Sequence, residues 1–414
     1  MFIAFGAGLQ YLLPLSAYTS KLLGLLFFFI LIALLIFYLQ KNHSLTNIWS
    51  LLVLIFSNTL LVKMSFENRP KLMVATFGFA SFLLIYKNIS SSKSALAAVF
   101  GSLAALSHLN GVIYIIAGFI VLLYCKEYHN LLIFSVVALL SLSFYFYDIW
   151  LFNGFATWQY QFGNDPATRD SLGLVNKLKV MVLYPKIFFE SPEQIVLSLL
   201  LLALGWHCRA FLKYLNARVV VYFLALFLSF WVLTKSATAI YQVLFIPLSF
   251  VLIIEFYTIA VAKTKFSKLI YFTAVLYLCV GVVGNLQIVA QNNTNYLPAQ
   301  FAKLRPILST QRVGLVPLTF FFDQYPHYDR LLCQTNFELQ MKYKKEKILT
   351  PNIFFDWASR NNVDFVVLDY LNNNAEYYPT RQTLQIGNYR RVYLDGQFGV
   401  YLVEGGYLEY ILNV

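Results

Sequence analysis

The stretch LLGLLFFFILIALLIFYL, residues 22–39, contains no charged side chain. It predicts a helix that crosses a bilayer, because about 20 apolar residues are needed to span the hydrocarbon core. Similar stretches follow along the chain, and we expect spans at residues 22–39, 48–62, 71–87, 94–107, 111–125, 131–152, 193–207, 218–234, 240–261 and 269–289. The predicted fold class is therefore an α-helical polytopic membrane protein with about ten transmembrane helices and a small C-terminal α/β domain.

The composition supports this class. Hydrophobic residues make up 59% of the 414-residue chain and charged residues only 12%, which is atypical of a water-soluble domain. The formal net charge of +12 does not indicate nucleic acid, because the basic residues of the apolar region lie mainly between the stretches. The four cysteines are spread along the chain and predict no disulfide framework.

The charge of the loops predicts the orientation in the membrane. The basic loops are residues 40–47, 87–93, 125–130, 207–218 and 262–268. All of them fall on one side if the chain crosses ten times, and basic loops favour the cytoplasmic side. We therefore expect an inner (plasma) membrane protein of a bacterium with the long loop 153–192 outside. Within that loop, residues 172–189 predict a helix in the headgroup region.

The pattern changes near residue 293, so we expect domain 1–292 to be the transmembrane bundle and domain 293–414 to be extracytoplasmic. Residues 313–316 and 365–368 predict buried strands. Thr350 and Pro351 predict a helix start. Residues 389–394 and 398–403 flank Asp395-Gly396 and predict a β-hairpin.

One outer segment, residues 63–71, carries three cations where basic residues are normally depleted. Lys63, Arg69 and Lys71 indicate an anionic partner, such as a lipid-linked phosphate, because their donors suit phosphate oxygens. The alternative interpretation is that they contact lipid headgroups or pair with Glu67.

Other polar residues are expected at the same membrane surface. His108 and Asn110 interrupt two short spans, either as part of a cavity or as a helix-turn device. Lys235, Tyr241 and Gln242 border the outer end of the eighth and ninth spans. They line the same crevice or, for Tyr241, belong to the aromatic belt of the interface.

Three short motifs resemble the GT-C class of integral membrane glycosyltransferases, which includes protein O-mannosyltransferases and lipid A aminoarabinose transferases. They are residues 67–70 (ENRP), the stretch from Gly101 through residues 107–111 (SHLNG), and residues 241–242 (YQ) followed by Ile246-Pro247. The resemblance also covers the order of parts, with apolar spans followed by an α/β tail. It implies transfer of a sugar from a polyprenyl-phosphate donor to a lipid, glycan or protein acceptor, by an inverting displacement at the outer face.

In this family an acidic residue in the first outer loop is the base or binds a metal, so a divalent metal is a possible cofactor. In this chain no Asp or Glu precedes Glu67, which makes Glu67 the candidate base. The candidate donor contacts are Lys63, Arg69, Lys71, His108, Asn110, Lys235, Tyr241 and Gln242. We also expect that an N-terminal span and acidic loop are missing ahead of Met1.

Two other function classes remain open. A transporter or flippase of a lipid-linked saccharide is the first, although the sequence shows neither clear internal repeats nor clear broken helices, which transporters often have. The second is a non-catalytic subunit of a membrane assembly, which the absence of the first-loop acid favours.

Overall fold

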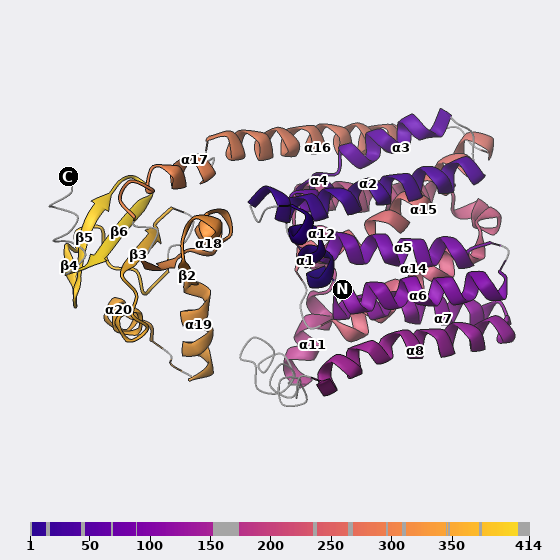
Figure 1. Ribbon diagram of the computed structural model, residues 1–414. Coiled ribbons are helices and arrows are strands. Elements are labelled where there is room, and N and C mark those ends of the chain that lie inside the picture. Colours follow the sequence, from indigo (N-terminus) through magenta and orange to yellow (C-terminus); the bar gives the residue numbers. More distant parts are fainter. Residues whose placement is uncertain are drawn as a thin grey trace. The chain divides into compact units, whose positions relative to one another are not determined.

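The computed structural model of the chain is shown in Figure 1. It describes all residues except 1, 14–16, 43–45, 68, 88, 152–173, 235–237, 264–267, 295–296, 309–311, 345, 347, 372–374 and 405–414. Two compact units are present, residues 1–9 with 21–290 and residues 10–20 with 291–414. Each unit has its own hydrophobic core.

The first unit is built of helices. They are α1 (Phe2–Leu12), α2 (Ala17–Asn42), α3 (Thr46–Phe56), α4 (Thr59–Ser65), α5 (Lys71–Ile85), α6 (Ser91–Ser107), α7 (Val112–Tyr124), α8 (Tyr128–Leu151), α11 (Leu174–Leu183), α12 (Lys186–Phe189), α13 (Pro192–His207), α14 (Ala217–Leu233), α15 (Ile246–Lys263) and α16 (Lys268–Thr294). Short 3-10 helices add η1 (Leu109–Gly111), η3 (Arg209–Tyr214) and η4 (Ala239–Leu244). Each predicted apolar stretch falls on one or more of these helices.

Fewer spans are evident than the ten we expected. Among the described residues, four helices are long and apolar enough to cross a membrane, at Lys21–Gln40, Tyr128–Tyr147, Ile246–Lys263 and Lys268–Gln291. Two sharply bent pairs raise the number to six, namely α3 with α4 (73°) and α11–α12 with α13 (88°). Helices α5, α7 and α14 are apolar but shorter. The prediction of several apolar spans is thus confirmed, whereas the number ten stays a prediction.

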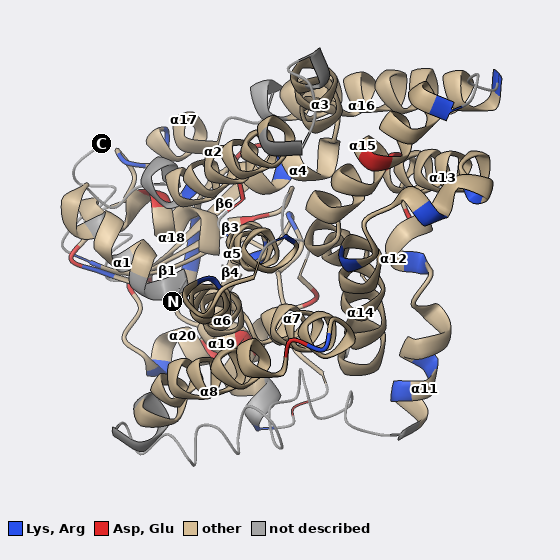
Figure 2. Ribbon diagram, turned by 90° about the vertical axis from the view of Figure 1, so that its right-hand side faces the viewer, with Lys and Arg blue, Asp and Glu red and all other residues tan. Residues whose placement is uncertain are grey.

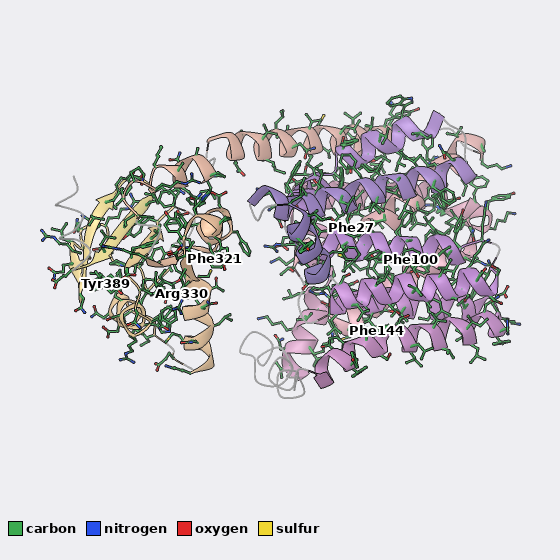
Figure 3. The ribbon with its side chains drawn as sticks, viewed as in Figure 1. Phe27, Phe100, Phe144, Phe321, Arg330 and Tyr389 are labelled. Atoms are coloured by element: carbon green, nitrogen blue, oxygen red, sulfur yellow. The ribbon has the colours of Figure 1, made fainter. Side chains whose placement is uncertain are left out.

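The surface of the helices is apolar as well as their interior. Phe144 of α8 is 68% exposed, whereas Phe27 of α2 is buried (Figure 3). In α5–α8 and α14 the charged residues are confined to the first or last turn (Figure 2). An apolar helix that exposes most of its surface is typical of contact with lipid rather than water. The first unit therefore has the character of a membrane protein.

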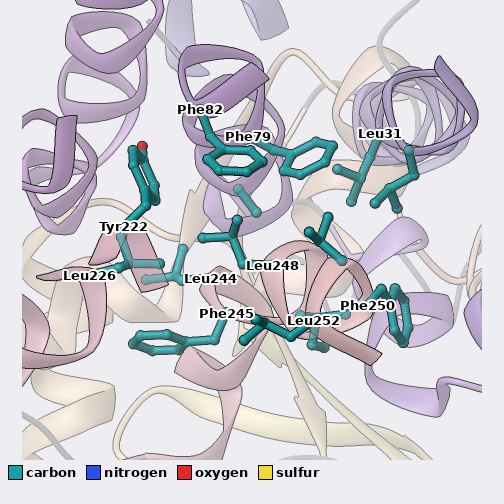
Figure 4. Close-up of a cluster of buried hydrophobic side chains, with 14 of the residues drawn as sticks. Leu31, Phe79, Phe82, Tyr222, Leu226, Leu244, Phe245, Leu248, Phe250 and Leu252 are labelled. Carbon is teal, nitrogen blue, oxygen red and sulfur yellow. The ribbon is translucent and has the colours of Figure 1, made fainter. Parts of the chain in front are cut away.

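The core of this unit contains aromatic side chains from α5 and α14 packed against the start of α15 (Figure 4). The ring centroids of Phe82 and Tyr222 are 5.1 Å apart. Tyr114 of α7 fills the space beside Gly78, and its hydroxyl donates a 2.6 Å hydrogen bond to the Leu244 carbonyl. This bond connects α7 to η4, the short helix that carries two of the predicted site residues.

The break between α3 and α4 is a feature that the sequence analysis did not anticipate. A helix end inside an apolar unit leaves carbonyl groups without partners, which is unfavourable away from water. Here α16 supplies the donors: the Asn285 side chain donates to the Phe56 carbonyl at 2.7 Å, and the Tyr277 hydroxyl donates to the Leu54 carbonyl at 2.8 Å. Asn58 caps the new helix with its side chain. The break is therefore stabilised by specific hydrogen bonds.

The second unit contains a six-stranded sheet in its described part, with the order β2-β1-β3-β6-β5-β4. The strands are β1 (Val313–Val316), β2 (Arg330–Cys333), β3 (Phe365–Asp369), β4 (Gln385–Ile386), β5 (Tyr389–Leu394) and β6 (Phe398–Val403). The helices are α17 (Leu297–Ala302), α18 (Leu318–Gln324), η5 (Tyr325–His327), α19 (Gln334–Tyr343) and α20 (Pro351–Arg360). Strand β1 is parallel to β2 and β3, whereas β3, β6, β5 and β4 pair antiparallel.

The predictions for this region are confirmed for β1, β3, α20 and the hairpin of β5 and β6. Thr350 caps α20 by accepting a hydrogen bond from the Ile353 backbone, and Pro351 follows at the first helical position. Strands β2 and β4 were not predicted. Strand β2 is four residues long and follows a polar segment, so it gives little periodic signal.

The contact between α16 and the α3–α4 break can be tested at Gly281. A Cβ atom there would overlap the Ser57 carbonyl oxygen, so we expect Gly281→Ala to lower the free energy of unfolding by about 1 to 3 kcal/mol. Gly205 in α13 is the control, because a Cβ there meets Phe256 at an ordinary 3.6 Å and alanine favours helix. Thermal unfolding midpoints in detergent measure both. An unchanged midpoint for Gly281→Ala would contradict this packing.

Candidate functional site

The segment between α4 and α5 carries the cations that the sequence singled out. Glu67 forms ion pairs with Lys63, at 3.8 Å between Nζ and Oε1, and with Arg69, at 3.1 Å between Nε and Oε2. The pairing with Glu67 that the alternative interpretation describes is thus present for Lys63 and Arg69. Asn68 of the same motif lies outside the described residues.

Lys71 has a different environment. It is only 9% exposed, and its Nζ lies 4.0 Å from the ring centroid of Tyr241. No Asp or Glu oxygen in the described part of the chain lies within ion-pair distance of this Nζ. A cation–π contact offsets only part of the cost of removing an ammonium group from water. Lys71 therefore has capacity for an anionic partner.

His108 lies at the end of α6, near enough to Lys71 for the charge of Lys71 to affect the pKa of His108. Its Nδ1 accepts a 3.2 Å hydrogen bond from the Asn110 backbone, so the neutral ring carries its proton on Nε2. Burial lowers the pKa of His108, and the charge of Lys71 lowers it further. We therefore expect a neutral ring at pH 7 whose Nε2–H can donate to an anion.

Two glycines allow the loops of the site to approach their neighbours. A Cβ at Gly111 would overlap the Ala104 carbonyl, so the turn after His108 requires glycine. A Cβ at Gly24 of α2 would lie 2.8 Å from the Ser65 carbonyl oxygen, which shows how closely α2 passes the end of α4. These contacts position the segment that carries Glu67.

The sequence analysis missed the residues that hold η4. The Ala239 backbone N–H donates to Glu190 Oε2 at 3.0 Å, and the Ala239 carbonyl accepts from Gln194 Nε2 at 2.7 Å. Ala239 begins the 3-10 helix that carries Tyr241 and the buried Gln242. Gln194 is also part of the capping box of α13, a pattern visible in the sequence, but its link to η4 depends on the fold.

The resulting cluster contains most of the predicted site residues. Lys71 contacts the ring of Tyr241. Its ammonium group lies near enough to the Glu67–Arg69 pair and to His108 for their charges to influence one another. Asn110 contributes its backbone N–H to His108, and Lys235 lies outside the described residues.

The residues around Glu67 do not fit a divalent metal. Its nearest charged neighbours are cations, which repel a metal ion. In the described ranges no group of three or more His, Cys, Asp or Glu side chains converges. A separate apolar cavity of about 480 Å³ lies among α3, α13, α15 and α16 and includes none of the predicted site residues.

Comparisons of the chain with protein-family models, curated proteins and solved structures found no match.

The environment of Lys71 leads to a test of stability. Replacing it by Met removes a buried charge that has no acidic partner among the described residues, so we expect Lys71→Met to raise the free energy of unfolding by about 1 kcal/mol. Lys63, whose side chain is 59% exposed, is the control, and Lys63→Met is expected to change stability by less than about 0.5 kcal/mol. Thermal unfolding in detergent gives both values. A clear loss of stability in Lys71→Met would identify Lys71 as a structural residue.

Proposed function

We propose that this chain is a membrane glycosyltransferase that uses a polyprenyl-phosphate sugar as donor. The observation that carries the proposal is Lys71, a buried ammonium group on the Tyr241 ring with no acidic partner among the described residues. A phosphodiester has one permanent negative charge and oxygens that accept charge-assisted hydrogen bonds. It matches Lys71 together with the neighbouring Arg69 and the Nε2–H of neutral His108.

The proposed chemistry assigns a step to each group. An acceptor hydroxyl attacks the anomeric carbon as the bond from that carbon to the phosphate oxygen breaks. Lys71 and Arg69 stabilise the negative charge that develops on the departing phosphate. Glu67 receives the hydroxyl proton, a contribution of about 10² to 10⁴ in rate for general-base catalysis. The phosphate remains on the polyprenyl chain.

Donor binding also affects Glu67 in this scheme. The side chain of Arg69 is 54% exposed, and its Nε lies 3.1 Å from Glu67 Oε2. A donor phosphate competes with the carboxylate for Arg69. The competition gives Glu67 freedom to approach the acceptor only when the donor is present.

The proposal includes the orientation expected from the loop charges. The chain crosses the inner membrane about ten times, with residues 63–71 and the C-terminal unit on the extracytoplasmic side. The shorter apolar helices α5, α7 and α14 together with α6 bring the six candidate spans to ten. Their lengths suit a locally thinned bilayer or flanking interfacial residues.

A transporter or flippase of lipid-linked saccharides is the second candidate, and the two bent helix pairs favour it. Transporters often bind substrate where helices are broken. Product analysis distinguishes the two: a flippase moves the donor without cleaving the sugar–phosphate bond, whereas a transferase releases polyprenyl phosphate. Turnover that Glu67→Gln abolishes supports the transferase. Binding without either activity supports a non-catalytic subunit.

Donor binding tests the phosphate site directly. We expect Lys71→Ala and Arg69→Ala each to weaken binding of a polyprenyl-phosphate sugar by about 10- to 100-fold, because hydrogen bonds to charged groups contribute about 1.5 to 3 kcal/mol. Lys179→Ala is the matched control, since Lys179 is an exposed cation of α11 expected on the same side of the membrane. Equal, small effects at all three positions would indicate ordinary headgroup contacts.

The pH dependence tests His108. Burial and Lys71 lower the pKa of His108 in the free protein, whereas a bound phosphodiester favours the charged ring and raises this pKa. Binding of the donor therefore takes up a proton. We expect the affinity for the donor to rise about 3- to 10-fold as the pH falls from about 7.5 to about 5.5. His108→Gln removes the titrating group and is expected to flatten the profile. An affinity that falls with decreasing pH would contradict the role of His108.

A further inference from the structure

The second unit contains an open surface cavity that the proposed function does not use. It has a volume of about 400 Å³ and is lined by Leu332, Asn336, Leu339, Gln340, Trp357 and Asn361. These residues come from the sheet edge strand β2, from α19 and from the end of α20 (Figure 1). The volume lies in the range of sites for small ligands.

Part of the polar capacity of the cavity is used internally. The Trp357 indole N–H donates to Gln340 Oε1 at 2.7 Å, and Asn361 Nδ2 donates to the Trp357 carbonyl at 2.8 Å. These two bonds fix the orientation of both amides, because each uses one known end of the side chain. Gln340 keeps its amide N–H groups and Asn361 keeps its carbonyl oxygen for a ligand.

Asn336 adds a third amide. It is exposed, and its side chain has no hydrogen-bond partner among the described residues of this unit. The lining therefore presents amide donors and amide acceptors from two helices. Leu332 and Leu339 add apolar surface beside them, and Leu339 is 53% exposed.

The chemistry of the lining indicates a neutral, polyhydroxylated ligand. None of the lining residues is Asp, Glu, Lys, Arg or His, so an ionic ligand would have no countercharge. A sugar hydroxyl both donates and accepts hydrogen bonds, as the available amides do. The C–H face of a sugar ring suits the two leucines. We propose that this cavity binds a neutral saccharide.

An extended peptide is the main competing ligand, and the structure favours it less. Peptides that add to a protein as strands are held along an exposed sheet edge by regularly spaced backbone groups. Here the polar groups are side-chain amides from α19 and α20, grouped around one small cavity. They suit one or two sugar rings better than a run of peptide units.

This inference goes beyond the proposed function and does not depend on it. The saccharide site lies in the unit of residues 10–20 with 291–414, whereas Lys71, His108 and Tyr241 lie in the other unit. Saccharide binding and binding of the phosphate-linked donor can therefore be measured separately, and failure of one proposal does not imply failure of the other.

The experiment uses the full chain in lipid nanodiscs and saturation-transfer NMR, with maltotriose and triacetylchitotriose as probes. We expect transfer to the ring protons of at least one probe. Asn336→Leu is expected to raise the dissociation constant about tenfold or more, because a sugar hydroxyl then loses its partner. Leu339→Trp is expected to abolish the transfer by filling the cavity from an exposed position.

The control is Asn388→Leu, which replaces an exposed amide outside the cavity and is expected to leave binding unchanged. Thermal unfolding midpoints equal to that of the unmodified chain show that each variant is folded. The proposal is overturned if neither probe receives saturation, or if Asn336→Leu and Leu339→Trp bind as the unmodified chain does. Displacement of the probes by an Ala-Ser peptide at lower concentration than by free saccharide would also overturn it, in favour of peptide binding.

Discussion

Polar groups inside an apolar unit must find partners, and this requirement governs the arrangement of the first unit. The break between α3 and α4 exists because α16 supplies Asn285 and Tyr277 to the carbonyls that the break leaves open. Gly281 lets α16 come close enough to do so. The direction of α4, and with it the start of the segment that carries Glu67, follows from this contact.

Lys71 meets the same requirement without an acidic partner among the described residues. Other buried polar residues of the unit, such as Thr76 and Ser81, donate to nearby backbone carbonyls. Lys71 has instead the face of Tyr241, and a second cation, Arg69, is near it. Such an arrangement is costly for stability and is typically retained where a ligand completes it. The contrast with Thr76 and Ser81 is the reason why we propose Lys71 as a binding group.

The sequence predicted the features that depend on local patterns. Apolar runs located the helices, and Asp395-Gly396 located the hairpin, because these signals reside in neighbouring residues. The cations 63, 69 and 71 drew attention because of the side of the membrane on which the loop charges predict them, and the short motifs brought His108 and Tyr241 into the same hypothesis. Other features depend on partners that are distant in the sequence, and a single sequence does not reveal such partners. These features are the helix breaks, strand β2 and the contact of Glu190 with η4.

The ion pairs of Glu67 do not remove the case for an anion site. Lys63 and Arg69 keep 59% and 54% of their side chains exposed, and exposed pairs of this kind contribute about 0 to 1 kcal/mol. Water can replace either partner at little cost, so both cations can change partners when an anion arrives. Water cannot replace a partner of Lys71 in the same way, because its buried ammonium group is not fully hydrated. Under the proposed function, Lys71 is therefore the first group to bind the anion. Arg69 then leaves its weakly bound carboxylate and adds a second contact.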